Sequence, residues 1–504
     1  MIDSKRIAKN TGFLYVRMLL VMIVSLYTSR VILDVLGADD YGLYNLAGGI
    51  VAMLAFLNGT LSTATSRFLT FDIGVGDFEK LKRTFSTTFI SHLGLGIVAV
   101  IIMETAGLWF ICNKAIIPIE RLNATLWVFH ISVATILITF TQVPYTSLIM
   151  AHEQMKAFAY ISLLEVFVKL GIAFLISVSP IDKLVFYSIM MFLSQFIVAM
   201  VYRYYCYKHW QESHLSKDFS FDTLKEMLSF SGWNTIAHLS ETLKLQGLTM
   251  LFGMFFQPVV IAAQSIATQL SNGITQFTNN FRSAINPQII KLYATEQYEE
   301  SKRLTLESSI YVFELFLLFG IPIFLLAEPV MNLWLKEVPE YAVSFSKCII
   351  VSSMLGTFSA GFYTPLTAAG KLRGNSLAAL YVCGGQFIIA YIILILGLDV
   401  MWVQYSYILV SIIFALIIKP YLLIRDLNYV VNDFIYCFKK ALYIFILSFF
   451  PPWLASLYID EKTVLGFCII VLISSISVLL VSYVFLPKEF RINLLGYIQH
   501  KLKA

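Results

Sequence analysis

The sequence predicts an all-α polytopic membrane protein with about fourteen transmembrane helices. Three observations support this prediction. Hydrophobic residues make up 58% of the 504 residues and charged residues only 13%, which is about half the charged share of an average soluble domain. Long apolar runs recur along the whole chain. Lysine and arginine gather in every second connection between these runs, a pattern typical of chains that cross a membrane many times.

Each apolar run is long enough to cross about 30 Å of hydrocarbon as a helix. The expected spans are residues 11–36, 42–66, 85–111, 123–150, 157–179, 184–202, 228–254, 257–281, 305–327, 341–367, 375–397, 401–418, 441–458 and 463–486. No connection between them is long enough to hold a soluble domain. The chain is therefore expected to consist of spans and short loops.

The positive charges predict the orientation of the spans. With the N-terminus inside, the inner segments hold 26 lysines and arginines. The outer loops hold five, namely Lys114, Arg121, Lys183, Lys336 and Lys462. Because these residues concentrate on the cytoplasmic side of a membrane, we expect an even number of spans and cytoplasmic N- and C-termini.

A repeat at an offset of about 220 residues divides the chain into two similar halves. The motif Glu-x-x-Lys-Arg at residues 79–83 recurs at residues 299–303, and Pro144 of the fourth span recurs as Pro365 of the tenth. The expected parts are an N-terminal lobe of spans 1–6 (residues 1–210), a C-terminal lobe of spans 7–12 (residues 211–427), and spans 13–14 with a cytoplasmic tail (residues 428–504). Two parallel six-helix repeats are typical of alternating-access transporters.

Polar residues form a stripe on two of the expected spans. On the eighth span, steps of three and four place them on one side of a helix; they are Gln264, Thr268, Ser271, Thr275, Asn279 and Arg282. The stripe on the second span consists of Asn45, Thr60, Thr63 and Arg67. Polar groups at membrane depth face protein or water. We expect the stripes to line an aqueous cavity; the alternative is that they form hydrogen bonds between helices.

Ionisable residues inside the spans are costly in hydrocarbon and usually functional. They are Arg17, Arg30, Glu104, Glu165, Lys169, His238, Glu241, Lys244, Glu307, Glu314 and Lys347. Arg17 and Arg30 lie near span ends, so they can instead extend to the lipid headgroups. Asp34, one turn beyond Arg30, can pair with it.

Two spans carry ionisable residues close together in the chain. Glu165 and Lys169 lie four residues apart in mid-span, so they can pair on one face, either in a binding site or as a structural ion pair. His238 and Glu241 share a face of the seventh span with Lys244, although a single interior histidine more often serves packing. The candidates for a cationic cavity are Arg17, Arg30, Arg67, Lys169, Lys244 and Arg282, and those for ion coupling are Glu165, His238 and Glu241.

No enzyme activity, cofactor or metal site is predicted. The sequence lacks the patterns H-E-x-x-H, G-x-x-x-x-G-K-[ST], G-x-S-x-G and D-D-x-x-D, and its six cysteines form no C-x-x-C pair. Asp39 and Asp40 at the outer end of the first span are expected to be solvated. The net charge of +5 is too small for this length to imply a nucleic-acid partner. Without a nucleotide site, transport would run on an ion gradient or on the gradient of the substrate.

Two stretches carry a resemblance to a known family. Residues 5–10, Lys-Arg-Ile-Ala-Lys-Asn, precede the first span, and residues 35–44 contain an L-G-x-x-x-Y-G-x-Y pattern. Together with fourteen spans, two six-helix lobes and basic inner loops, they resemble polysaccharide-biosynthesis flippases of the Wzx type. These belong to the MOP superfamily, with the MATE exporters and the lipid II flippase.

The resemblance implies a pseudo-two-fold, MATE-like arrangement and a flippase of the bacterial inner membrane. Its substrate would be an undecaprenyl-pyrophosphate-linked oligosaccharide, moved to the periplasmic leaflet for O-antigen or capsule assembly. Relatives place arginines of the first, second and eighth spans at the lumen, where they meet the pyrophosphate; by position these correspond to Arg17, Arg30, Arg67 and Arg282. The implied partners are this lipid, membrane lipid, Na⁺ or H⁺, and a polysaccharide polymerase with its chain-length regulator.

Three other functions stay open at this point. A MATE-type exporter of organic cations would favour an acidic, aromatic cavity, whereas the cations of this chain equal or exceed the carboxylates inside the candidate cavity. A membrane polysaccharide polymerase, ligase or acyltransferase would need a long outer loop or a catalytic His-Asp pair, and neither occurs. An assembly protein that transports nothing would share the topology.

Overall fold

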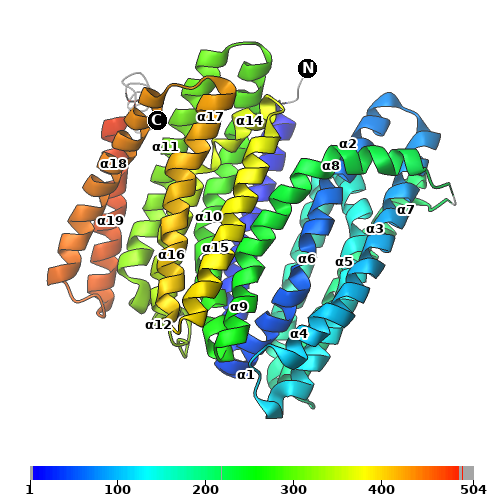
Figure 1. Cartoon of the computed structure of the whole chain (residues 1–504), viewed down its shortest axis with the longest axis horizontal. Helices are drawn as coiled ribbons and strands as arrows, with labels where there is room; N and C mark the ends of the chain where they lie inside the picture. The colour runs from blue at the N-terminus through cyan, green and yellow to red at the C-terminus, as the bar shows by residue number, and fades with distance from the viewer. Residues whose placement is uncertain (1–3, 217, 487–490, 492–504) are drawn as a thin grey trace. The chain divides into compact units, whose positions relative to one another are not determined.

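The computed structural model describes residues 4–216, 218–486 and 491, and of these the side chains of all except 4–17, 230, 231 and 234. Helices dominate the described residues, which contain no strand, and Figure 1 follows them in colour along the chain. Among these residues, eleven helices are long and apolar enough to cross a membrane. The chain is therefore an all-α, multi-pass membrane protein, as predicted, and the count of fourteen spans stays a prediction.

The chain divides into two compact units. The first unit consists of Met1–Ser265, Trp334–Ala342 and Ser376–Asp399, and the second of Ile266–Leu333, Val343–Asn375 and Val400–Ala504. Compactness and sequence repetition are different criteria, so the lobes expected from the repeat stay a prediction.

The helices wholly or mainly in the first unit are α1 (Ser4–Ala52), α2 (Ala55–Val75), α3 (Phe78–Ile102), α4 (Leu108–Asn113), α5 (Ile119–Ala151), α6 (Met155–Leu175), α7 (Lys183–His209), α8 (Phe221–Thr242), α9 (Leu248–Phe255) and α15 (Leu372–Ile395). Those wholly or mainly in the second unit are α10 (Pro258–Ala294), α11 (Tyr298–Leu325), α12 (Ala327–Trp334), α13 (Ala342–Ala360), α14 (Tyr363–Ala368), α16 (Val400–Ile413), α17 (Lys419–Leu427), α18 (Val431–Tyr458) and α19 (Val464–Phe485).

The helix α1 joins two of the expected spans. Its backbone leaves helical geometry at Gly37, where φ is 79° and ψ is 167°, a conformation that glycine adopts readily and other residues do not. The chain breaks again at residues 53–54, between α1 and α2. The expected second span, 42–66, is thus divided between two helices. Because residues 53–54 are Met and Leu, no glycine or proline marks this break in the sequence.

A second glycine of the L-G-x-x-x-Y-G-x-Y pattern allows a close approach of backbones. A Cβ atom on Gly42 would lie 2.0 Å from the carbonyl oxygen of Pro258, the first residue of α10. This distance is far below van der Waals contact, so only glycine fits. Both glycines of the pattern therefore have structural roles, Gly37 in a bend and Gly42 in a helix contact.

The core of the first unit is built around α5, which packs against α7, α3 and α2 (Figure 1). One buried cluster contains Phe85 of α3, Tyr145 of α5 and Tyr202 of α7. The rings of Phe85 and Tyr145 meet edge to face with centroids 5.2 Å apart. This aromatic packing holds the three helices as one group.

The sequence repeat is visible in the local structure. α3 begins at Phe78 and α11 at Tyr298, so both copies of the Glu-x-x-Lys-Arg motif lie in the first turns of a helix. Two residues earlier, Gly76 and Glu296 both adopt a left-handed backbone, with φ of 79° and 62°. The same helix–turn–helix unit therefore occurs at both positions.

The second unit packs the apolar side of α10 against α11 and α13. Ile274, Phe316 and Ile350, one from each helix, form a buried cluster. The ring of Phe277 stacks on Phe319 with centroids 5.0 Å apart. α18 and α19 form a hairpin that packs against α11.

Candidate functional site

The helices with predicted polar stripes differ from the other long helices. α2, α8 and α10 are each long enough to cross a membrane but are not among the eleven helices that are also apolar enough. They carry most of the candidate residues of the second, seventh and eighth expected spans. Polar side chains on these three helices need water or protein around them at membrane depth.

The seventh expected span runs antiparallel to the second inside the first unit. A Cβ on Gly59 of α2 would lie 3.3 Å from Nδ1 of His238 on α8, and a Cβ on Gly49 of α1 would lie 3.0 Å from the side chain of Thr249 on α9. Along this contact, residue numbers fall in the second span as they rise in the seventh, so the two spans run in opposite directions. By this register, Lys244 lies near the level of the break at residues 53–54.

The predicted polar residues of the second span occupy two helices. Asn45 lies on α1, where its side-chain amide donates to the carbonyl oxygen of Tyr41 at 2.7 Å. Thr60 on α2 is buried and its hydroxyl donates to the carbonyl oxygen of Phe56 at 2.7 Å. Thr63 and Arg67 are exposed. Of this stripe, Thr60 is buried, Asn45 is half-buried, and Thr63 and Arg67 are the exposed residues.

Glu165 and Lys169 form the ion pair that their spacing allows. Lys169 Nζ lies 2.6 Å from Glu165 Oε1, and the side chains are 39% and 30% exposed for lysine and glutamate. The pair is therefore neither dry nor fully open. Its carboxylate satisfies the lysine, so Lys169 is a weaker anion-binding candidate than the arginines.

Among the candidates of the seventh expected span, His238 on α8 lies against a small residue of α2. His238 is exposed and its ring contacts Gly59. Glu241 is exposed and Lys244 half-buried, and both act electrostatically on Cys383 of α15. The structure thus brings His238 to the α2 helix, and Glu241 with Lys244 to α15.

The stripe on α10 serves two purposes. Ser271 is buried and donates to the hydroxyl of Ser353 on α13 at 2.8 Å, an interhelical hydrogen bond. Thr275 bonds back to the carbonyl oxygen of Ser271 at 3.1 Å. Asn279 is exposed and Arg282 half-buried. One part of the stripe therefore forms an interhelical hydrogen bond, and the lining of an aqueous cavity by the rest stays a prediction.

Arg282 stands out among the candidate cations. It lies on the polar side of α10, and among residues whose side chains the structure describes it has no hydrogen bond or ion pair. A guanidinium carries five donors, and a buried donor without a partner is costly. Arg282 is therefore suited to an anionic ligand.

The remaining candidates have less definite surroundings. Arg30, Gln264 and Thr268 are half-buried. The ring of Tyr27, one turn before Arg30, lies 6.1 Å from that of Phe174 near the end of α6. Arg17 belongs to α1, but its side chain lies outside the described part of the structure.

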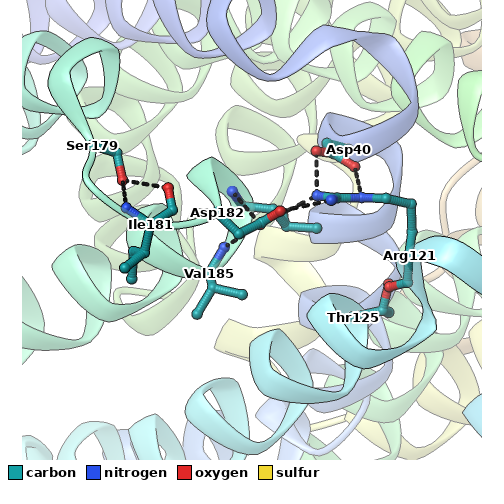
Figure 2. Close-up of polar contacts among 8 residues, drawn as sticks. Asp40, Arg121, Thr125, Ser179, Ile181, Asp182 and Val185 are labelled. Carbon is teal, nitrogen blue, oxygen red and sulfur yellow. Dashed lines mark hydrogen bonds and ion pairs between the residues drawn. The ribbon is translucent and has the colours of Figure 1, made fainter.

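The Asp39–Asp40 pair was expected to be solvated, and for Asp40 this expectation is wrong. Arg121 of α5 binds both oxygens of Asp40, at 2.8 and 2.6 Å, and also contacts Asp182 at 2.6 Å (Figure 2). Asp182 in turn accepts from the backbone N–H of Leu184 at 3.0 Å and caps α7. This network joins the ends of α1, α5 and α7, although its residues are far apart in the sequence.

The electrostatics of Asp182 favour its charged form. Burial alone would raise the pKa of this carboxyl, but the hydrogen bond from Arg121 and the backbone N–H groups at the start of α7 outweigh burial and lower the pKa below its usual 3.8. Asp182 is thus ionised throughout the neutral range. It acts as an anchor for Arg121.

Other polar contacts were not predictable from single positions. Asp72, only 1% exposed, accepts from Thr84 at 2.7 Å and lies 3.1 Å from Lys80 Nζ. Glu104 lies 3.0 Å from His130 Nδ1, with side chains 36% and 43% exposed. The in-span position of Glu104 was visible in the sequence, but its partner on another helix was not.

Three π-helical turns interrupt the described helices, at η1 (Met103–Gly107), η4 (Leu243–Gly247) and η5 (Phe414–Ile418). Glu104 lies within the first, Lys244 within the second, and Lys419 directly after the third. Such turns occur frequently at functional sites. Lys419 Nζ donates to the carbonyl oxygen of Ser359 at 3.1 Å, so this cation has a structural partner.

Comparison with solved structures identifies the fold. The inward-facing conformation of a multidrug resistance MATE family transporter of the MOP superfamily matches with a TM-score of 0.67 and 17% identity, covering 82% of this chain and 97% of that one. An outward-facing MATE conformation matches with a TM-score of 0.58 and 16% identity, over 83% and 95%. The lipid II flippase MurJ, in an inward closed conformation, matches with a TM-score of 0.64 and 14% identity, over 94% and 98%.

No family model matches the sequence, and no curated protein matches it. At these identities the likeness concerns the fold. The MurJ comparison covers a larger share of this chain than the MATE comparisons do, by roughly the length of the α18–α19 hairpin. The chain has the helical membrane fold shared by MATE transporters of the MOP superfamily and the lipid II flippase MurJ.

Proposed function

We propose that the protein is a flippase that moves a polyprenyl-pyrophosphate-linked oligosaccharide across the bacterial inner membrane by alternating access. The lipid would be undecaprenyl pyrophosphate and the product O-antigen or capsular polysaccharide. Both termini would be cytoplasmic, and a polymerase with its chain-length regulator would receive the product. The fold supports a transporter or flippase, since both kinds of protein share it.

The observation that carries the proposal is Arg282, a guanidinium at the end of the eighth expected span that pairs with none of the described side chains. A pyrophosphate cannot cross hydrocarbon without a binding partner, and a guanidinium binds phosphate oxygens in a bidentate manner. Arg67, exposed on α2, is the second guanidinium suited to this role. Lys244 and Lys169 would add positive charge.

The polar surfaces of α2 and α10 suit the sugar part of the substrate. Thr63, Asn272 and Asn279 are exposed and offer hydroxyl and amide groups to sugar hydroxyls. The polyprenyl tail would stay in the lipid. Exposed His238 and Glu241 are the first candidates for coupling to H⁺ or Na⁺. Glu165, which is paired with Lys169, is the third candidate.

A MATE-type exporter of organic cations is the second candidate, because the MATE structures match with comparable TM-scores. Such a ligand would need a carboxylate without a counter-charge. Glu241 is an exposed carboxylate on α8, inside the seventh expected span. Transport of a cationic dye into vesicles, abolished by Glu241→Gln, would favour this alternative.

The direct test is the substitution Arg282→Ala in the native host. Loss of a charge-assisted contact of 1.5–3 kcal/mol corresponds to roughly 10- to 100-fold weaker binding. We expect lipid-linked oligosaccharide to accumulate in the inner leaflet and surface glycan to fall accordingly. Arg282→Lys should retain part of the activity, since it keeps the charge and loses the bidentate geometry.

The matched control is Arg303→Ala. Arg303 pairs with Glu307 at 3.1 Å and its side chain is 78% exposed, so its loss should leave glycan display unchanged. Membrane protein levels measured in parallel separate a binding defect from a folding defect. Full-length surface glycan from both Arg282→Ala and Arg67→Ala would refute the cationic site.

A further inference from the structure

A buried carboxyl group lies where three helices of the second unit meet. Glu314 of α11 is 8% exposed, and α11 packs there against α18 and α19. Its carboxyl group makes a hydrogen bond with the hydroxyl of Ser482 on α19, and Lys440 of α18 acts on it electrostatically. None of the candidate residues for substrate binding or ion coupling belongs to this group.

Glu314 lacks the close counter-charge that Glu104, Glu165 and Glu307 have. Within the described residues, no lysine, arginine or histidine nitrogen lies within 4 Å of it, whereas Glu165 has Lys169 at 2.6 Å. An isolated buried carboxylate is expensive because its charged form loses water. The neutral acid avoids this cost and can donate its proton to the Ser482 hydroxyl.

A positive charge nearby stabilises the ionised form of the Glu314 carboxyl group. Lys440 attracts the carboxylate of Glu314 and also acts on the Cys437 thiol on α18, and the Tyr311 hydroxyl on α11 interacts with Glu314. Glu307, one turn before Tyr311, is already paired with Arg303 at 3.1 Å. A single cation at a distance, without a direct ion pair, gives a site that can hold or release a proton.

The two helices of the hairpin beside Glu314 are hydrogen-bonded to each other. Ser477 of α19 donates to the carbonyl oxygens of Leu447 and Ser448 on α18, at 3.2 and 3.1 Å, which ties these two helices to each other. Toward α11 the contacts include the Glu314–Ser482 hydrogen bond and the Cys437 thiol, 3.8 Å from the carbonyl oxygen of Leu306. The carboxyl group of Glu314 therefore lies in the contact between the α18–α19 hairpin and α11.

We propose that Glu314 is a proton-binding site whose occupancy sets how tightly the α18–α19 hairpin packs against α11. With the proton bound, the neutral carboxyl group fits the dry contact. When the proton leaves to water, the carboxylate requires hydration, and the hairpin separates from α11 to admit it. The inference concerns the protein alone and goes beyond the transport of any substrate.

The test uses Cys437 as a reporter, because it is 2% exposed and lies in the same contact. In a variant with the other five cysteines replaced, the rate of labelling by an uncharged maleimide is measured in Glu314 and in Glu314→Gln protein. The ratio of the two rates cancels the pH dependence of the thiol chemistry. We expect this ratio to rise about tenfold from about pH 5 to about pH 8.

A ratio that stays flat across this range overturns the proposal. Lys440→Met, which removes the attracting cation, should shift the rise to higher pH; an unshifted rise would also count against it. Because Lys440 also acts on the Cys437 thiol, the ratio for Lys440→Met is taken against Lys440→Met protein that carries Glu314→Gln. Glu314→Leu is the neutral reference in both ratios should Glu314→Gln fail to fold. Glu307→Gln, whose carboxylate belongs to a surface pair, is the matched control and should leave the profile unchanged.

Discussion

Arg121 connects carboxylates from two other helices, and its loss would leave Asp40 and Asp182 facing each other without a counter-charge. The side chains of the three residues are 28%, 18% and 38% exposed, in the order Arg121, Asp40, Asp182. Removing one partner of a partly buried network leaves a charge without compensation, which costs more than the loss of an exposed pair, worth at most about 1 kcal/mol. The network therefore fixes the ends of α1, α5 and α7 to one another.

Asp182 makes this network sensitive to acid. Burial raises its pKa, but the hydrogen bond and charge of Arg121 and the backbone N–H groups at the start of α7 together outweigh burial and lower the pKa in the folded protein. The resulting stabilisation is fully present above the unfolded value of 3.8 and is lost as the pH falls below it. We expect the melting temperature in detergent to drop between about pH 5 and about pH 3, and this drop to shrink in Asp182→Asn. Asp218→Asn, at an exposed position, is the control; equal effects of the two substitutions would contradict the prediction.

At the scale of elements, the contact between α1 and α10 depends on a missing side chain. Gly42→Ala would place a Cβ 2.0 Å from the Pro258 carbonyl oxygen, so the two backbones must separate. We expect a destabilisation of about 3 kcal/mol or more, measured as loss of folded protein in a detergent melting assay. Gly48→Ala on the same helix, with no atom within 4 Å, should be neutral or stabilising by up to about 1 kcal/mol. Equal melting temperatures for the two variants would refute the close approach.

Elements defined by local spacing were predictable from sequence. The Glu165–Lys169 pair follows from a step of four residues on one helix, and it occurs in the structure. The break at residues 53–54 was missed because its residues are compatible with a helix. The contact of Arg121 with Asp40 joins positions 81 residues apart, and no local pattern records such a pairing.

At the scale of the whole molecule, the charge pattern predicts which side each connection faces. Cys112 is exposed at the end of α4, which this pattern places outside. As the only cysteine, it should react with a membrane-impermeant maleimide in spheroplasts. Thr295→Cys, exposed after α10, should react only after permeabilisation. The opposite result would invert the predicted orientation.

The low hydropathy of α2, α8 and α10 has a consequence for biogenesis. A newly made segment with so many hydroxyl, amide and charged groups gains too little free energy from transfer into hydrocarbon to enter the bilayer without a partner helix. Only Phe256 and Gln257 separate α9 from α10, so these two would enter the bilayer together as a hairpin. α10 can separate from α9 only after α11 and α13 have been synthesised and can pack against it. The order of assembly therefore follows the order of translation.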